Sequence, residues 1–144
     1  MKILLTGGAG YIGSHVLLSI IENKHEVIVI DDLSTGNIDL IPKGIKLINT
    51  NINNSEKISN ILVAEHFDLL LHFAGFIKVE ESVHNPDKYF KNNTDNAIEL
   101  FETCYKHNLQ NIIFSSTAAA YGNPNNNESK PNGFGGYNSI FEIE

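Results

Sequence analysis

A cluster of glycines close to the N-terminus has the composition and spacing of a phosphate-binding turn. Its members are Gly7, Gly8, Gly10 and Gly13. Without a Cβ, Gly10 lets the backbone approach a pyrophosphate, and Gly13 lets the following helix lie close to the preceding strand. The free N–H groups and the positive dipole at the start of that helix favour a bound phosphate. The glycines alone fit an ordinary turn equally well, so their surroundings decide between the two interpretations.

An acid at the end of the next apolar run completes the pattern of a dinucleotide site. The apolar run 3–5 precedes the glycines, a helical pattern follows them, and the apolar run 27–30 leads into Asp31. This acid stands about 20 residues after the glycines, where a carboxylate accepts hydrogen bonds from an adenosine ribose. Its negative charge repels a 2′-phosphate, which favours NAD over NADP. Strand, turn, helix, strand and acid together predict dinucleotide binding.

The remaining apolar segments predict a parallel sheet that places these residues at one edge. Apolar runs at 45–48, 67–73 and 111–115 predict further strands. Helices are predicted after the glycine turn, from a cap at Ser55, and from Asn85-Pro86-Asp87 to about His107. The fold class is therefore α/β, a Rossmann-like doubly wound parallel sheet of about five strands in the order 3-2-1-4-5. Ligands of such sheets bind at the carboxyl ends of the strands.

Composition restricts the classes of function. The 144 residues fit one domain, and 42% apolar residues suffice to bury a core. The net charge of −7 argues against a nucleic-acid partner, which would need clustered Lys and Arg. No apolar run is long enough to span a bilayer and no signal peptide precedes the first strand, so no membrane partner is expected. The single cysteine, Cys104, fits a reducing cytoplasm and a buried apolar role.

Five short segments resemble the extended short-chain dehydrogenase/reductase family. They are TGGAGYIGSH (6–15), DDLSTGN (31–37), HFAG (72–75), ESVHNP (81–86) and FSSTAAAYGNP (114–124). Within that family they are most similar to the UDP-glucose 4-epimerases. The resemblance runs from Met1 to about Pro124 and then fades. It implies an NAD-binding Rossmann-like domain over 1–122 and a divergent, loop-rich tail over 123–144.

The resemblance implies NAD as the cofactor and assigns its contacts residue by residue. They are Gly7, Gly10, Tyr11, Ile12, Gly13, Asp31, Asp32, Ser34, Thr35, Gly36, Asn51, Ile52, Phe73, Ala74, Gly75, Ile77, Asn92 and Ser115. Asn51 replaces an acid near adenine, which keeps an acceptor oxygen and loses a charge. Ile77 stands where the epimerases often have a lysine, and Lys78 comes one residue later. The polar run 34–36 also fits an ordinary turn, and Asn92 also fits an exposed helix position.

The catalytic residues that the resemblance implies are only partly present. The family uses a tyrosine and a lysine four residues later, on one face of a helix, where the lysine lowers the pKa of the phenol. Tyr137 is the candidate base, but Phe141 occupies the lysine position. Shifting the match to Phe134 puts Asn138 at that position, so neither register restores the pair. Thr117 supplies the hydroxyl that would orient the reacting sugar oxygen.

Other residues of the resembling segments receive different roles. The family places its proton chemistry away from His72, and a histidine at a strand end is more often structural, so we predict a structural role for this residue. No metal site is predicted. The family's dimer contact uses a helix like the one that begins at Asn85, which makes a homodimer an expectation.

Three functions are compatible with this pattern. The first is the cofactor half of a UDP-glucose 4-epimerase, which interconverts UDP-galactose and UDP-glucose by hydride transfer to NAD and back. The second is an NAD-binding fragment without catalysis, favoured by the missing lysine and by the expectation that the chain is truncated before a substrate domain. The third is the N-terminal part of another nucleotide-sugar epimerase or dehydratase, since these share the first half.

Overall fold

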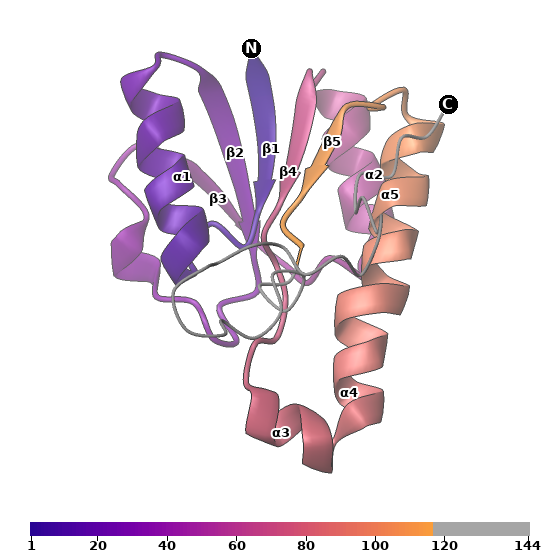
Figure 1. Ribbon diagram of the computed structural model, residues 1–144. Coiled ribbons are helices and arrows are strands. Elements are labelled where there is room, and N and C mark those ends of the chain that lie inside the picture. Colours follow the sequence, from indigo (N-terminus) through magenta and orange to yellow (C-terminus); the bar gives the residue numbers. More distant parts are fainter. Residues whose placement is uncertain (117–144) are drawn as a thin grey trace, which may run out of the picture.

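A parallel five-stranded sheet lies at the centre of the computed structural model, which describes residues 1–116. The strand order is β3-β2-β1-β4-β5, as predicted (Figure 1). The strands are β1 (Lys2–Thr6), β2 (Glu26–Asp31), β3 (Lys46–Asn49), β4 (Leu69–His72) and β5 (Ile112–Phe114). Thr6 pairs with Ile30 of β2 and with His72 of β4, so these strands end level with one another. The residues that follow them therefore meet at one edge of the sheet.

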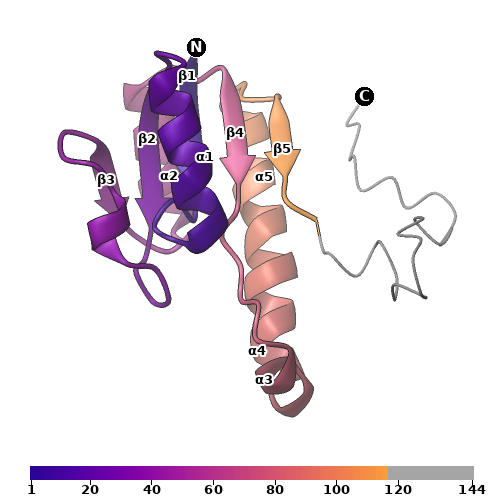
Figure 2. The ribbon, with the colours of Figure 1, turned by 60° about the vertical axis from the view of Figure 1, so that its left-hand side comes forward.

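Helices cover both faces of the sheet (Figures 1 and 2). They are α1 (Tyr11–Glu22), α2 (Ser55–Ala64), α3 (Val79–His84), α4 (Pro86–Phe90) and α5 (Asn96–Lys106), with a 3₁₀-helix, η1 (Ile38–Leu40), and a π-helix, η2 (Lys91–Asp95). Helix α1 lies on one face, and α2 and α5 lie on the other. The short helices α3 and α4 project beyond the carboxyl edge of the sheet (Figure 1).

The alternation of side chains along each strand builds two apolar layers. Leu4 and Leu70 face α2 and α5, where they pack in one cluster with Ile58 and Leu100. The neighbouring Leu5 packs in a second cluster with residues of α1. A strand covered on both faces needs apolar residues at consecutive positions, which explains the unbroken apolar runs in the sequence.

Two predicted helix starts need correction. The side chain that caps α2 belongs to Asn54, whose oxygen accepts a hydrogen bond from the Lys57 amide at 3.0 Å, and Ser55 is the first helical residue. Asn85 precedes Pro86 at the start of α4 but makes no side-chain capping hydrogen bond. Helix α3 was not predicted, because its apolar residues are exposed and give no core-facing stripe.

The buried cysteine behaves as the sequence indicated. Cys104 is fully buried in α5, and burial raises the pKa of its thiol to about 12, which fits a packing role. No helix within residues 1–116 is long and apolar enough to cross a membrane.

Candidate functional site

An open cleft of about 530 Å³ lies at the carboxyl ends of β1 to β4. Its lining residues are Gly7, Gly10, Ile30, Asp31, Asp32, Ser34, Thr35, Gly36, Thr50, Asn51, Ile52, Phe73, Ala74, Gly75, Phe76 and Asn92. Most of them are residues that the sequence assigned to a cofactor. The position is the one at which open α/β sheets bind their ligands.

The glycine turn forms the centre of the cleft and allows three segments to meet there. Gly7 has φ +75°, and a Cβ on it would lie 2.5 Å from the Ala74 nitrogen after β4. A Cβ on Gly13 would lie 2.1 Å from the Gly7 oxygen, so only glycine lets α1 begin directly against the turn. Gly10 occupies the N-cap position of α1, where no side chain caps the helix. The first-turn amides of a helix have no intrahelical partner, which makes this end of α1 suited to an anion.

The Asp31 carboxylate joins the turn to the end of β2. Its Oδ2 accepts the Ala9 amide at 2.9 Å and its Oδ1 accepts the Leu33 amide at 2.9 Å. A carboxylate offers about four acceptor positions, so two remain for a ligand hydroxyl. The residue is buried but lines the cleft.

Next to it, Asp32 is held by polar neighbours. Partial burial acts to raise the pKa of Asp32, but hydrogen bonds from the Ser34 hydroxyl and amide and from the Asn51 side chain outweigh burial and lower it. The Asn51 Nδ2 donates to Asp32 Oδ2 at 2.6 Å, and its Oδ1 accepts the Asn53 amide at 3.0 Å. This side of the cleft therefore carries a stable carboxylate charge.

The opposite side of the cleft is formed by the loop after β4. Phe73 continues the alignment with β1 through a hydrogen bond from its amide to the Thr6 oxygen at 3.0 Å. Ala74, Gly75 and Phe76 follow along the cleft, and Asn92 reaches it from the π-helix η2. A Cβ on Gly75 would make only an ordinary contact, 3.5 Å from Asn93 Oδ1.

Sequence reasoning missed three lining residues, Ile30, Thr50 and Phe76. Each stands next to a residue that was assigned to the cofactor or to the loop that carries it. These residues could have been found from their position at a strand end, because the neighbours of a predicted contact lie at the same edge of the sheet.

Five predicted cofactor residues do not line the cleft. The side chains of Tyr11 and Ile12 are exposed on the first turn of α1, and Gly13 lies beneath the turn. Ile77 is 87% exposed. Ser115 follows β5, where its amide donates to the His72 oxygen at 3.1 Å. Thr117 and Tyr137 lie outside the described residues.

His72 lies behind the cleft, in the core. Its side chain is 1% exposed, and its Nδ1 is 2.6 Å from Thr6 Oγ1. Burial lowers its pKa to about 4, so the ring is neutral near pH 7. Because the ring does not line the cleft, these contacts support the structural role predicted for it.

The sheet order, the glycine turn and the acid at the end of β2 define a Rossmann-like domain of the dinucleotide-binding class. Residues 3–139 match the family described as "NAD dependent epimerase/dehydratase family". The chain belongs to this family.

Individual relatives and solved structures are also epimerases of this kind. The UDP-glucose 4-epimerase of Azospirillum brasilense is 42% identical over 123 residues, which are 85% of this chain and 35% of the relative. The crystal structure of UDP-glucose 4-epimerase with UDP-glucose from Thermotoga maritima is 35% identical, with a TM-score of 0.80 over 88% of this chain and 41% of that one. The crystal structure of the Thermus thermophilus UDP-glucose 4-epimerase in complex with NAD is 31% identical. Its TM-score is 0.82, over 89% of this chain and 42% of that one. The chain thus spans well under half the length of these relatives.

Proposed function

We propose that this chain is the NAD-binding part of a UDP-glucose 4-epimerase. The observation that carries the proposal is the cleft, in which the glycine turn, Asp31 and the loop after β4 meet at one edge of the sheet. The likeness to epimerases whose structures contain NAD or UDP-glucose supports the choice of cofactor and of the UDP-sugar substrate.

The residues of the cleft fit a dinucleotide. The turn at Gly7 and Gly10, with the start of α1, would hold the two phosphates, including through the first-turn amides of Tyr11, Ile12 and Gly13. Asp31 would accept the adenosine ribose hydroxyls, while Asn51 and Ile52 would lie near adenine. When bound, NAD supplies a reversible hydride acceptor for the sugar carbon.

In this proposal Tyr137 takes the proton from the hydroxyl on carbon 4 of the sugar, and Thr117 orients that oxygen. A phenol has an ordinary pKa near 10, so it needs a nearby positive charge to act as a base near neutrality. Phe141 stands at the position four residues after Tyr137, where the family pattern has lysine. The phenylalanine at this position supplies no positive charge, which favours the second candidate function, in which the chain binds NAD without turnover.

Calorimetric titration of the 144-residue chain with NAD and with NADP tests the cofactor proposal. We expect NAD to bind and NADP to bind far more weakly, because the Asp31 and Asp32 side chains would face the 2′-phosphate. At a concentration 100 times the dissociation constant, NAD should also stabilise the folded chain by about 2.7 kcal/mol. An absence of NAD binding by a folded chain would refute the proposal.

A turnover assay separates the two candidate functions. The chain is incubated with NAD and UDP-galactose, formation of UDP-glucose is followed, and Tyr137→Phe is the matched control. We expect no conversion by either protein, because no lysine supports the phenol. Conversion by the wild-type chain above the level of the control would reject the binding-only function.

We also propose a homodimer in the cytoplasm. The helical run from α4 through α5 exposes Phe90, Ile98 and Tyr105, which recur about every two helical turns along it. A surface of this kind suits a second copy of the helix. Sedimentation analysis should give the mass of a dimer, and a monomer at high concentration would contradict this assignment.

A further inference from the structure

One side chain, that of Asn93, holds both backbone groups of a residue in the cleft wall. The Phe76 amide donates to Asn93 Oδ1 at 2.8 Å, and Asn93 Nδ2 donates to the Phe76 oxygen at 2.8 Å. The pair mimics the exchange of hydrogen bonds between two strands. It also fixes the orientation of the amide, because turning it over would place donor against donor and acceptor against acceptor.

The π-helix η2 connects this pair to a second residue of the cleft. Asn92 and Asn93 are adjacent in η2, and Asn92 Nδ2 donates to Asn93 Oδ1 at 2.9 Å. Asn92 lines the cleft and is one of the predicted cofactor contacts. Short π-helical turns of this kind occur frequently at functional sites. Asn93 therefore links the positions of Phe76 and Asn92 without lining the cleft itself.

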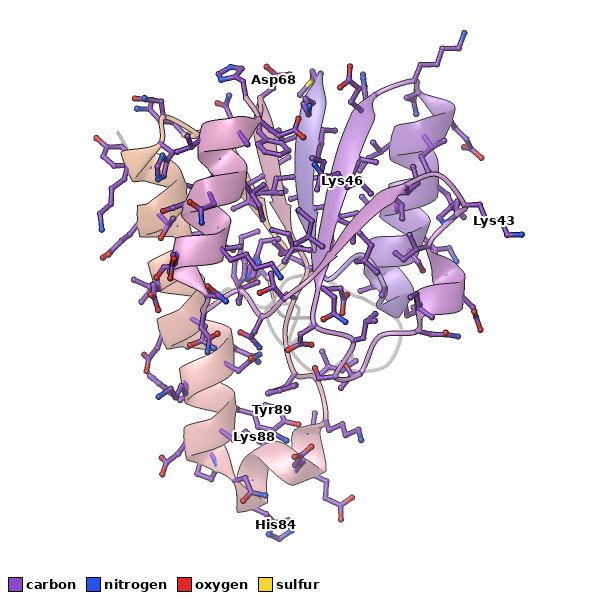
Figure 3. All side chains as sticks on the ribbon, turned by 180° about the vertical axis from the view of Figure 1, so that it is seen from behind. Lys43, Lys46, Asp68, His84, Lys88 and Tyr89 are labelled. Atoms are coloured by element: carbon purple, nitrogen blue, oxygen red, sulfur yellow. The ribbon has the colours of Figure 1, made fainter. Side chains whose placement is uncertain are left out.

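The ring of Phe76 is held from the other side by the hairpin of α3 and α4. Its centroid is 5.6 Å from that of Tyr89, and the Lys88 ammonium lies 4.7 Å from it. The side chains of Lys88 and Tyr89 lie between α4 and α3 (Figure 3). Both bind the Glu81 carboxylate of α3. The hairpin fixes the ring and Asn93 fixes the backbone, so the cleft wall at Phe76 is set by groups outside the cleft.

The topology assigns this wall to one half of the cleft. The ends of β2 and β3, with Asp31 and Asn51, lie on one side of β1, and the end of β4, with Gly75 and Phe76, lies on the other. A dinucleotide whose phosphates rest on the glycine turn after β1 would place one nucleoside over each side.

We propose that Asn93 is a positioning residue for the nucleoside that lies over the β4 side of the cleft. This inference rests on the proposed NAD site. In it, Asn93 acts through Phe76 and Asn92, and the adenosine and phosphate contacts on the β2 side do not depend on it.

The test compares two nucleotides on three proteins. NAD and ADP are titrated into the wild-type chain, Asn93→Ala, and Thr94→Ala, which alters the same π-helical turn and leaves the Phe76 contacts in place. ADP carries the adenosine and both phosphates but no second nucleoside. We expect Asn93→Ala to weaken NAD binding about tenfold and ADP binding less than about twofold. The tenfold loss corresponds to one or two lost hydrogen bonds, and it affects NAD alone because only NAD has a nucleoside on the β4 side. Thr94→Ala should match the wild type.

Each other outcome has a definite meaning. Equal weakening of both nucleotides, or unchanged NAD binding, by Asn93→Ala rejects the positioning role while the NAD site stands. A folded wild-type chain that binds neither nucleotide rejects the proposed function and this inference with it.

A second variant adds a readout that general destabilisation would not move. Asn93→Asp keeps the acceptor for the Phe76 amide but turns an oxygen toward the Phe76 carbonyl. A protonated carboxyl can donate there, and the ordinary pKa of an aspartate is about 3.9. The NAD affinity of this variant relative to wild type should therefore rise as the pH falls from 7.5 to about 4.5. A ratio that is independent of pH would reject the donor contact as the cause.

Discussion

The burial of His72 should make the stability of the folded chain depend on pH below neutrality. Its ring is packed between Phe101 and Phe114, with centroid distances of 5.3 Å and 5.5 Å. Its Nδ1 is bonded to Thr6, and its buried Nε2 has no hydrogen-bond partner within residues 1–116. Burial lowers the pKa from 6.5 to about 4, because a charged imidazolium would lose its hydration there.

The sign and size of the effect follow from the two pKa values. Between pH 6.5 and about 4 the unfolded chain binds a proton at His72 and the folded chain does not. The contribution to stability is therefore complete above pH 6.5 and is lost progressively as the pH falls through the folded pKa. At about 1.4 kcal/mol for each pKa unit, the full loss is roughly 3 kcal/mol.

Urea unfolding at pH 7.5 and 4.5 measures this loss when wild type is compared with His72→Asn. The variant is less stable at both pH values because it leaves space in the core, so the informative quantity is the change between them. We expect the wild type to lose roughly 2–3 kcal/mol more than His72→Asn across this range. The exposed His84 provides the control, since His84→Asn should keep the wild-type dependence. Parallel pH dependences of wild type and His72→Asn would refute the reasoning.

Two further pairs of substitutions test the contacts that build the cleft and the helix next to it. Gly13→Ala should lower the free energy of unfolding by roughly 3 kcal/mol, because the added Cβ would meet the Gly7 carbonyl. Gly75→Ala should change it by less than about 1 kcal/mol, because its Cβ would make only an ordinary contact. Equal losses for the two variants in urea unfolding would contradict this contrast. Asn54→Ala should cost about 1 kcal/mol in the same assay by removing the cap of α2. Ser55→Ala should cost less, and the reverse order would place the cap at Ser55.

The sheet could be predicted from the sequence because its signals are local. Apolar runs alternate with helical stripes, and the glycine turn fixes where the first strand passes into the first helix. Parallel strands joined by helices then allow few orders, and the order observed is the predicted one. The helix starts were less predictable, since Asn54 and Ser55 are both good capping residues and only the backbone geometry selects Asn54.

The contacts that hold the site could not be predicted from spacing. Asn93 meets Phe76 and Thr6 meets His72 across long separations in sequence, and an asparagine or threonine carries no signal of its partner. The π-helical turn that presents Asn92 and Asn93 also has no residue pattern of its own in this sequence. Residues that line the cleft follow strand ends and are found by position, whereas residues that support the lining depend on tertiary packing.

The amide at position 51 shows how one departure from the family pattern changes the chemistry of its neighbour. Asn51 Nδ2 donates to Asp32 Oδ2 at 2.6 Å and contributes to the lowered pKa of that carboxyl. An aspartate at 51 would bring a second carboxylate against Asp32, and like charges at such a distance disfavour ionisation of one of them. The asparagine therefore keeps Asp32 charged beside Asp31, at the end of β2 where a 2′-phosphate would have to lie. Through its hydrogen bond to Asp32, Asn51 thus supports the negative charge on which the expected preference for NAD over NADP depends.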